Sequence, residues 1–186
     1  MTRLFAKRDS LPEQIAYQAV EEHYVLASWR AVGIAVWIDE APVEAIQEAQ
    51  RMLARLSSEH PDGIAFFQVI GEENESIDAP ARNALKELLR AGREFIREAP
   101  VVYEGSGFRA AAVRAIVTGL LSQRSYGFTH RVYSSIEDGA LAVGRKFEKR
   151  EPTRYARELC EALASVRDRH QRLFPTTPHS FIRYKR

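Results

Sequence analysis

A short glycine-containing turn offers the first residues whose types and spacing suggest chemistry. Residues 105–110, GSGFRA, follow a short apolar run and satisfy the dinucleotide-binding pattern G-x-G-x-x-A at the start of a predicted helix. Free backbone amides and the helix dipole attract a phosphate at such a start, and Arg109 adds positive charge. That pattern normally occupies the first strand-to-helix turn of its domain, with an acidic residue about 20 positions later. Two uses therefore stay open: an anion site at Ser106, Gly107 and Arg109, or a tight turn capped by Ser106.

A second candidate is an acidic loop that follows the apolar run at 64–70. Four carboxylates fall within seven residues: Glu72, Glu73, Glu75 and Asp78. Open α/β sheets bind ligands at the carboxyl ends of their strands, so a magnesium site or a general acid/base pair is conceivable there. No further polar partner can be identified, and a solvated acidic loop is the simpler interpretation. Ser76 is the only hydroxyl in this loop and a possible phosphate acceptor.

The remaining reactive side chains show no pattern that indicates catalysis. The five histidines, at 23, 60, 130, 170 and 179, lack metal-ligand spacing, and Cys160 is the single cysteine. Ser106 does not sit in the G-x-S-x-G motif of hydrolases. We therefore expect no metal, no cofactor and no catalytic residue.

The elements that must position these residues follow from the hydrophobic pattern. Apolar residues at three- and four-residue steps predict a helix from Pro42 to His60 and a second from Pro80 to residue 97, the latter with Phe95 and Ile96 on its apolar face. A third helix is predicted to begin near Gly107. Predicted strands are two or three segments within 15–38, then 64–70, 101–103 and 129–133.

Two further features belong to the last part of the chain. Ser134 and Glu137 have the spacing of a capping box and predict the start of another helix. Residues at heptad-like spacing then predict an amphipathic helix, suited to pack on the domain or on a second copy: Tyr155, Leu159, Leu163, Val166, His170 and Leu173. Strands that alternate with helices predict an α/β fold with a mostly parallel or mixed sheet of four to five strands and this extra C-terminal helix.

The segment SIDAPARNALKELLR, residues 76–90, resembles the central loop and helix of STAS domains, the bacterial anti-sigma-factor antagonists and their relatives. The family pattern is an apolar residue, Asp-Ser-Ser-Gly and a Leu-rich helix, and Ile77 and Asp78 match its start. The two hydroxyl positions and the glycine position hold Ala79, Pro80 and Ala81. The strand at 129–133 with the following SSIEDGALAV also resembles the end of a STAS domain. The resemblance covers about residues 15–147.

The resemblance implies a surface for a protein partner. In the family, the loop and the following helix meet a kinase or another regulator, and the second hydroxyl accepts a phosphate. By resemblance, the partner-binding residues here are Ser76, Asp78, Arg82 and Lys86. Because proline has no hydroxyl, the usual phosphoswitch is lost at position 80. We expect a non-catalytic bacterial signalling or scaffolding protein, with a small-molecule or anion binder, or an enzyme that uses the GSG turn, as the alternative.

Composition and charge limit the compartment and the partners. We divide the chain into an N-terminal extension (1–13), a STAS-like domain (14–150), a C-terminal amphipathic helix (151–174) and a basic flexible tail (175–186). No apolar run approaches the length of a membrane span, so we expect a cytoplasmic protein. The net charge of +2 is too small to indicate a nucleic-acid partner. A homodimer through the C-terminal helix is a further possibility.

Overall fold

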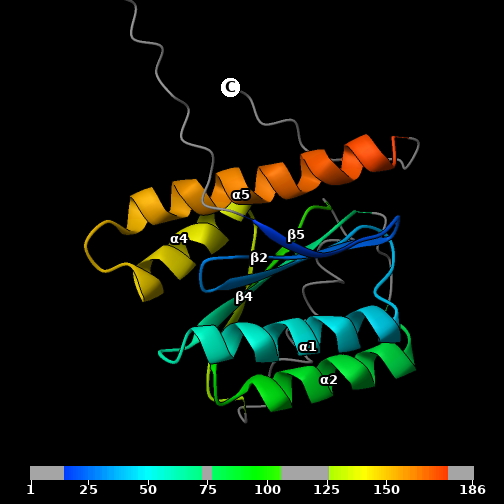
Figure 1. The fold of residues 1–186 in the computed structure, drawn as a ribbon, viewed down its shortest axis with the longest axis horizontal. Helices are drawn as coiled ribbons and strands as arrows, with labels where there is room; N and C mark the ends of the chain where they lie inside the picture. Colours follow the sequence, from blue (N-terminus) through cyan, green and yellow to red (C-terminus); the bar gives the residue numbers. More distant parts are fainter. Residues whose placement is uncertain (1–14, 73–76, 106–125, 176–186) are drawn as a thin grey trace, which may run out of the picture.

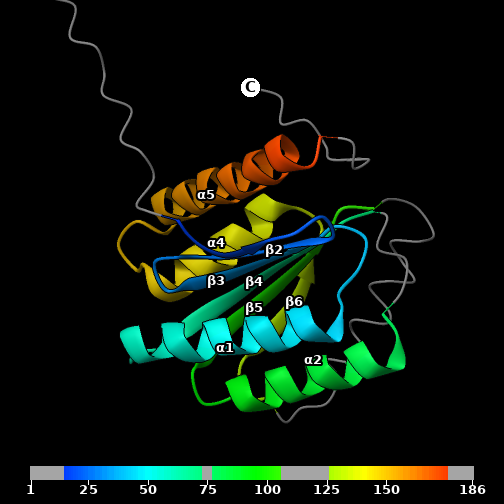
Figure 2. The ribbon, with the colours of Figure 1, turned by 45° about the vertical axis from the view of Figure 1, so that its right-hand side comes forward.

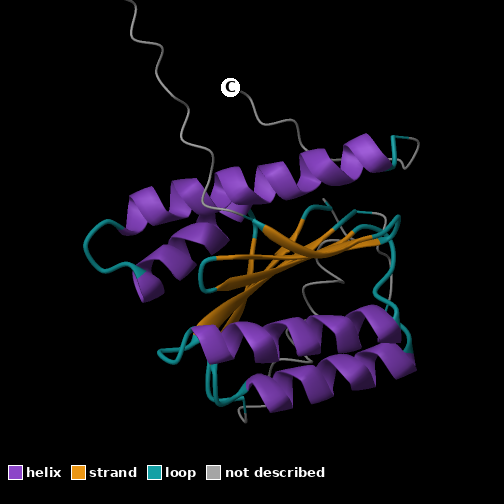
Figure 3. Ribbon diagram, in the orientation of Figure 1, coloured by secondary structure: helices purple, strands orange, loops and turns teal. Residues whose placement is uncertain are grey.

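A computed structural model describes residues 15–72, 77–105 and 126–175 (Figures 1 and 3). Within them the chain forms a mixed β-sheet with helices on both faces. The strands are β1 (Ala16–Val20), β2 (Tyr24–Trp29), β3 (Val32–Trp37), β4 (Ile64–Ile70), β5 (Ile96–Tyr103) and β6 (Thr129–Tyr133). The helices are α1 (Val43–Glu59), α2 (Ala79–Gly92), α4 (Ile136–Phe147) and α5 (Pro152–Leu173).

The strands lie side by side in the order of the sequence, β1-β2-β3-β4-β5-β6. The first three pair antiparallel, whereas β3 to β6 pair parallel. The α/β class and the mixed sheet are therefore confirmed. In the described part of the chain the sheet has six strands, more than the expected four to five, because residues 15–38 form three strands, the higher of the two numbers predicted there, and β1 extends the sheet at one edge.

Among the described residues, a pair of helices covers each face of the sheet (Figures 1 and 2). α1 and α2 cover one face, and α4 and α5 cover the other. Crossover connections between parallel strands are nearly always right-handed. Because the chain moves in one direction along the sheet from β3 to β5, both crossover helices fall on the same face, and the second face is left to the helices that follow β6.

The face under α1 and α2 is packed closely. Ile46 and Leu53 of α1 are almost fully buried with Phe66 of β4. Gly33 of β3 lies directly below α1, and a Cβ atom there would overlap the side chain of Leu53. The glycine thus allows α1 to approach the sheet. β4 is buried along nearly its whole length, as its continuous apolar sequence predicts.

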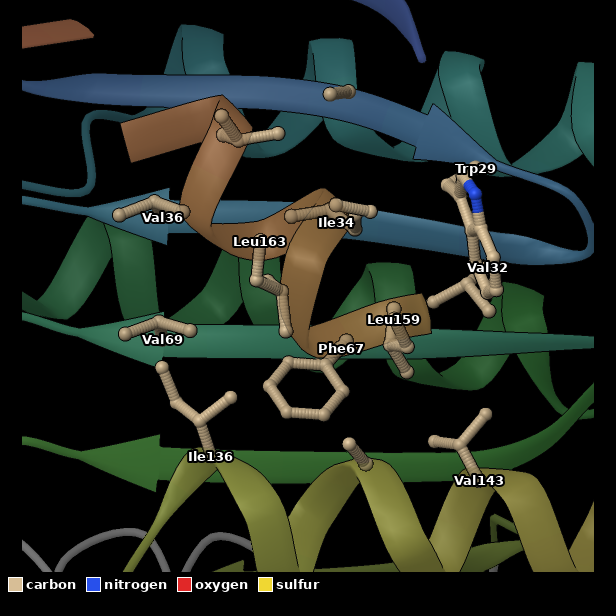
Figure 4. Close-up of a cluster of buried hydrophobic side chains, with 14 of the residues drawn as sticks. Trp29, Val32, Ile34, Val36, Phe67, Val69, Ile136, Val143, Leu159 and Leu163 are labelled. Carbon is tan, nitrogen blue, oxygen red and sulfur yellow. The ribbon is translucent and has the colours of Figure 1, made fainter. Parts of the chain in front are cut away.

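The opposite face forms a second cluster between the sheet, α4 and α5 (Figure 4). Phe67 lies at its centre, with Leu159 and Leu163 above the sheet and Ile136 and Val143 at one side. Leu159 and Leu163 have no exposed surface. The apolar stripe of α5 is therefore part of the core of its own chain.

The turn between β2 and β3 fixes the first half of α5. Trp29 and Tyr155 meet edge to face at 5.1 Å between ring centroids, and the guanidinium of Arg30 lies 4.4 Å from the Trp29 ring. Arg30 also forms a 2.9 Å ion pair with Glu158. Its backbone has a positive φ of 48°, which turns the chain tightly enough for these contacts.

Two sequence-based boundaries are wrong. The second helix ends at Gly92, and Ile96 begins β5 instead of continuing the helix to residue 97. The three- and four-residue spacing of Phe95 and Ile96 fits a helix, but pairing of Ile96 with Ile64 in the sheet overrides this local pattern. A Cβ atom at Gly92 would overlap Ile96, so the glycine permits the tight passage from helix to strand.

The predicted capping box of α4 is also wrong by one residue. Ser135, not Ser134, is the N-cap, and its hydroxyl oxygen accepts from the backbone amide of Asp138 at 3.1 Å. The same hydroxyl donates to the Asp138 carboxylate at 2.9 Å. Both serines are followed three residues later by an acid, so sequence spacing alone does not distinguish them.

Several predictions fall outside the described residues. They include the helix near Gly107, the extension at 1–13 and nearly all of the tail at 175–186. The homodimer through α5 stays a prediction, but the apolar face on which it rested is buried against the sheet. In the described part of the chain, no helix combines the length and the apolar character that crossing a membrane requires.

A matched pair of leucines tests the role of α5 in the core. We expect Leu163→Ala to lower the free energy of unfolding by about 2 to 5 kcal/mol, because it opens a cavity in a fully buried site. Leu173, in the same helix, is 55% exposed, and Leu173→Ala should change the value by less than about 0.5 kcal/mol. Urea unfolding of both variants measures the difference, and equal effects would contradict the assignment of α5 to the core.

Candidate functional site

The candidate site lies at the carboxyl edge of the parallel strands, where α1 and α2 begin. Asp78 is the N-cap of α2, and its Oδ1 atom accepts from the amide of Ala81 at 2.7 Å. Pro80 lies in the first turn, where its missing N–H costs nothing. The sequence-based expectation for this helix start is confirmed. One carboxylate oxygen of Asp78 is thus engaged in holding the helix.

Three of the four predicted partner-binding residues are described. Asp78 and Arg82 are exposed, and Lys86 is half-buried. Because Asp78, Arg82 and Lys86 follow one another at steps of four residues, they lie on the same side of the helix start. The Nη2 atom of Arg82 donates to the carbonyl oxygen of Ile77 at 3.2 Å, which ties the arginine to the end of the loop. Ser76 lies outside the described residues, as do Glu73 and Glu75.

A pocket of about 370 Å³ opens beside this surface, between the starts of the two helices. Its lining consists of the segment before and inside the first turn of α1 and the corresponding residues of α2: Glu40, Ala41, Pro42, Val43, Glu44, Ile77, Asp78 and Ala81. Ala81 is buried, and Ala41, Val43 and Ile77 are half-buried against the core below α1 and α2. The pocket therefore has an apolar wall.

Three carboxylates complete the lining of this pocket. Glu40, Glu44 and Asp78 are all exposed, and no ion pair links any of them to a cation of the described residues. The described part of the chain also holds no group of three or more acidic, histidine or cysteine side chains that fits a metal ion. The sequence patterns indicated Asp78 but not Glu40 and Glu44, because these two lie 38 and 34 positions earlier in the chain.

A pair formed by His23 and Asp39 lies next to the acidic residues at this edge. Nδ1 of His23 lies 2.9 Å and 3.1 Å from the two carboxylate oxygens of Asp39, which follows β3. The hydrogen bond to Asp39 raises the pKa of His23, and the charge of Glu40 acts in the same direction. Both side chains are solvent-accessible, so this pair contributes little to the folding free energy.

A buried ion pair lies at the end of β5. Glu104 and Arg167 of α5 are only 7% and 10% exposed and are joined by a hydrogen bond through Nη2 and Oε1. Burial raises the pKa of Glu104, although the guanidinium of Arg167 opposes this shift. The two residues are 63 positions apart, and no sequence spacing indicates the pair. It connects α5 to the carboxyl edge of the sheet.

Other buried titratable groups lie on opposite faces of the sheet. Glu98 is register partner of Ala65, which belongs to the cluster under α4 and α5. His130 is register partner of Ala99, which belongs to the cluster under α1 and α2. Paired residues share a face, so the sheet separates Glu98 from His130 and they cannot act as an acid/base pair. Burial raises the pKa of Glu98, and hydrogen bonds from Thr129 and Tyr133 oppose this shift.

Cys160 has the character of a structural thiol. It is half-buried in α5 and packs against the core on that face of the sheet. Burial raises the pKa of its thiol to about 11, and Glu137 and Glu161 act in the same direction. At neutral pH the side chain therefore stays protonated, whereas a nucleophilic cysteine acts as the thiolate.

The alternative anion site cannot be placed. Ser106, Gly107 and Arg109 lie outside the described residues, and Gly105 is the last residue before them.

Comparison of the chain with models of protein families, with curated proteins and with solved structures found no match.

The cap of α2 allows a direct test. We expect Asp78→Ala to lower the free energy of unfolding by about 1 kcal/mol, because the amide of Ala81 loses its acceptor. Asp78→Asn should lower the free energy of unfolding by only a few tenths of that 1 kcal/mol, because the asparagine side chain also accepts a hydrogen bond at an N-cap. Urea unfolding distinguishes the two, and equal losses would show that the carboxylate charge, not the cap, stabilises the helix.

His130 gives a pH-dependent test. Both of its ring nitrogens are buried without a hydrogen-bond partner, and this burial lowers its pKa to about 4. An unfolded histidine titrates near pH 6.5, so the unfolded chain binds the extra proton first and stability falls as the pH drops from about 6.5 to about 4. When the pH is lowered from 7 to 5, the free energy of unfolding of the native chain should fall by about 1 to 2 kcal/mol more than that of a His130→Leu variant.

Urea unfolding of both proteins at the two pH values provides the measurement. The comparison with the variant removes the contributions of Glu98 and Glu104, whose raised pKa values act in the opposite direction. Identical pH dependence in the two proteins would show that His130 is readily protonated in the folded state.

Proposed function

We propose that the chain is a non-catalytic signalling or scaffolding protein that binds a protein partner through the start of α2. The partner-binding residues are Ser76, Asp78, Arg82 and Lys86. The resemblance of this loop and helix to STAS domains supports the proposal. So does the arrangement of Asp78, Arg82 and Lys86, which lie on one side of a helix and are accessible in whole or in part.

The observation that carries the proposal is the firm attachment of α2 beneath this surface. Ala81, Leu88 and Leu89 are buried in one cluster with residues of α1 and the sheet, while Arg82 is exposed. A binding surface on a packed helix keeps its geometry and loses little conformational entropy when a partner binds. The N-cap by Asp78 and the contact of Arg82 with the Ile77 carbonyl further fix the end of the loop.

Position 80 determines how this surface would be regulated. Ala79 and Pro80 occupy the hydroxyl positions of the STAS pattern, and both are exposed in the first turn of α2. Neither side chain accepts a phosphate. Binding is then constitutive or is controlled at another site, and a scaffold fits this better than a phosphorylation-driven switch.

Charge reversal on α2 tests the proposal. A photo-reactive amino acid at the exposed Asn83 would crosslink a partner in extract from the source cells, and quantitative mass spectrometry would measure its yield. We expect Arg82→Glu with Lys86→Glu to reduce the yield at least about tenfold, a loss of about 1.4 kcal/mol in binding. Asp78 stays intact in this variant, so α2 keeps its cap.

The matched control reverses two positive charges elsewhere. Lys149, in the connection between α4 and α5, and Arg157, in the first half of α5, are both exposed, so Lys149→Glu with Arg157→Glu changes the net charge equally. This control should keep the partner. A partner that is retained equally by both variants, or lost equally from both, would remove the α2 surface from the binding site.

A further inference from the structure

The pocket between the starts of α1 and α2 adjoins the proposed partner surface and shares Asp78 with it. We propose that this pocket receives a basic side chain, arginine or lysine, from the protein partner. The inference rests on the proposed function, because it specifies the chemistry of the partner at the same surface. It commits to a partner segment with a basic residue that enters the pocket.

Charge decides which kind of side chain the pocket favours. Glu40, Glu44 and Asp78 contribute three negative charges, and no cation of the described residues pairs with them. The starts of α1 and α2 oppose them with about half a positive charge each. The mouth therefore carries a net charge of about −2 and attracts a cation more strongly than an anion.

The apolar wall fits the stem of such a side chain. Arginine and lysine bury three or four methylene groups along apolar surface while the charged end stays near water. Ala41, Val43 and Ile77 provide that surface, with the carboxylates exposed around it. The volume of about 370 Å³ is at the small end of the range for ligand pockets, which suits one long side chain better than a large cofactor.

The positive residues next to the pocket indicate a second chemical feature of the partner. Arg82 and Lys86 follow the pocket along α2 and favour an acidic group. A partner segment that places a basic residue in the pocket and an acidic residue beside α2 is complementary to both surfaces. Such alternating charge fixes the register of the segment, because a shift would bring like charges together.

The probe is N-acetyl-arginine-N-methylamide, compared with its citrulline analogue, which has the same shape and no charge. Titration into the isotope-labelled full chain is followed by the backbone amide signals of Val43, Glu44, Asp78 and Ala81. We expect the arginine compound to shift these signals in a saturable manner, and the citrulline compound to bind at least about fivefold more weakly. Added salt should weaken the arginine binding, because the carboxylates are exposed.

Variants of the rim provide the second part of the test. Glu40→Gln with Glu44→Gln should weaken arginine binding about fivefold, because each exposed ion pair contributes about a twofold effect or slightly more. Glu21→Gln with Glu22→Gln removes the same charge from exposed residues that do not line the pocket, and it should leave binding within about twofold. Equal binding of arginine and citrulline, or equal effects of the two variants, would overturn the proposal.

The crosslinking experiment separates this proposal from the proposed function. Glu40→Gln with Glu44→Gln leaves Arg82 and Lys86 unchanged. If this variant keeps the crosslinked partner and arginine does not bind the native chain, the pocket has no role and the α2 surface stands. If charge reversal at Arg82 and Lys86 leaves the partner bound, the proposed function fails whatever the arginine titration shows.

Discussion

The fold depends on one topological constraint, the step-by-step order of its parallel strands. Each crossover from β3 to β5 moves in the same direction along the sheet, so α1 and α2 fall on one face. The other face carries large apolar side chains, among them Trp29, Ile34 and Phe67. These side chains require cover from elsewhere in the chain. α4 and α5, which follow the last strand, supply it.

This constraint explains why α5 is so strongly fixed. At one end, Arg30 joins the turn between β2 and β3 to Glu158, and at the other the ring of His170 lies 2.9 Å from the carbonyl oxygen of Glu22. The buried ion pair of Glu104 and Arg167 holds the C-terminal half of α5 against the end of β5. At Gly144, α4 approaches the start of α5 so closely that a Cβ atom would overlap the Pro152 carbonyl. The sequence left open whether this helix packs on its own domain or on a second copy, and in the structure its apolar face is part of the core of its own chain.

The same arrangement determines which surfaces remain for a partner. The apolar stripe of α5 is used inside the molecule, and so is the buried face of α2. What α2 presents is a charged surface beside a partly apolar pocket, with negative residues at the helix starts and positive ones along the helix. The proposed recognition of a partner rests on charge arrangement and shape, and it needs no rearrangement of the core.

Local residue patterns specify the individual helices and strands and the class of fold. Residues 64–70 and 129–133 are strands as their β-branched and apolar composition predicts, α1 follows its helical period, and Asp78 caps α2. These features depend on neighbours within a few positions. Three other features depend on how whole elements pack: Ile96 joins a strand, Glu104 pairs with Arg167, and Glu40 and Glu44 share a pocket with Asp78. The physical reason is distance along the chain: a pattern of period two or 3.6 specifies which face a residue occupies, whereas a contact across tens of residues depends on how whole elements pack.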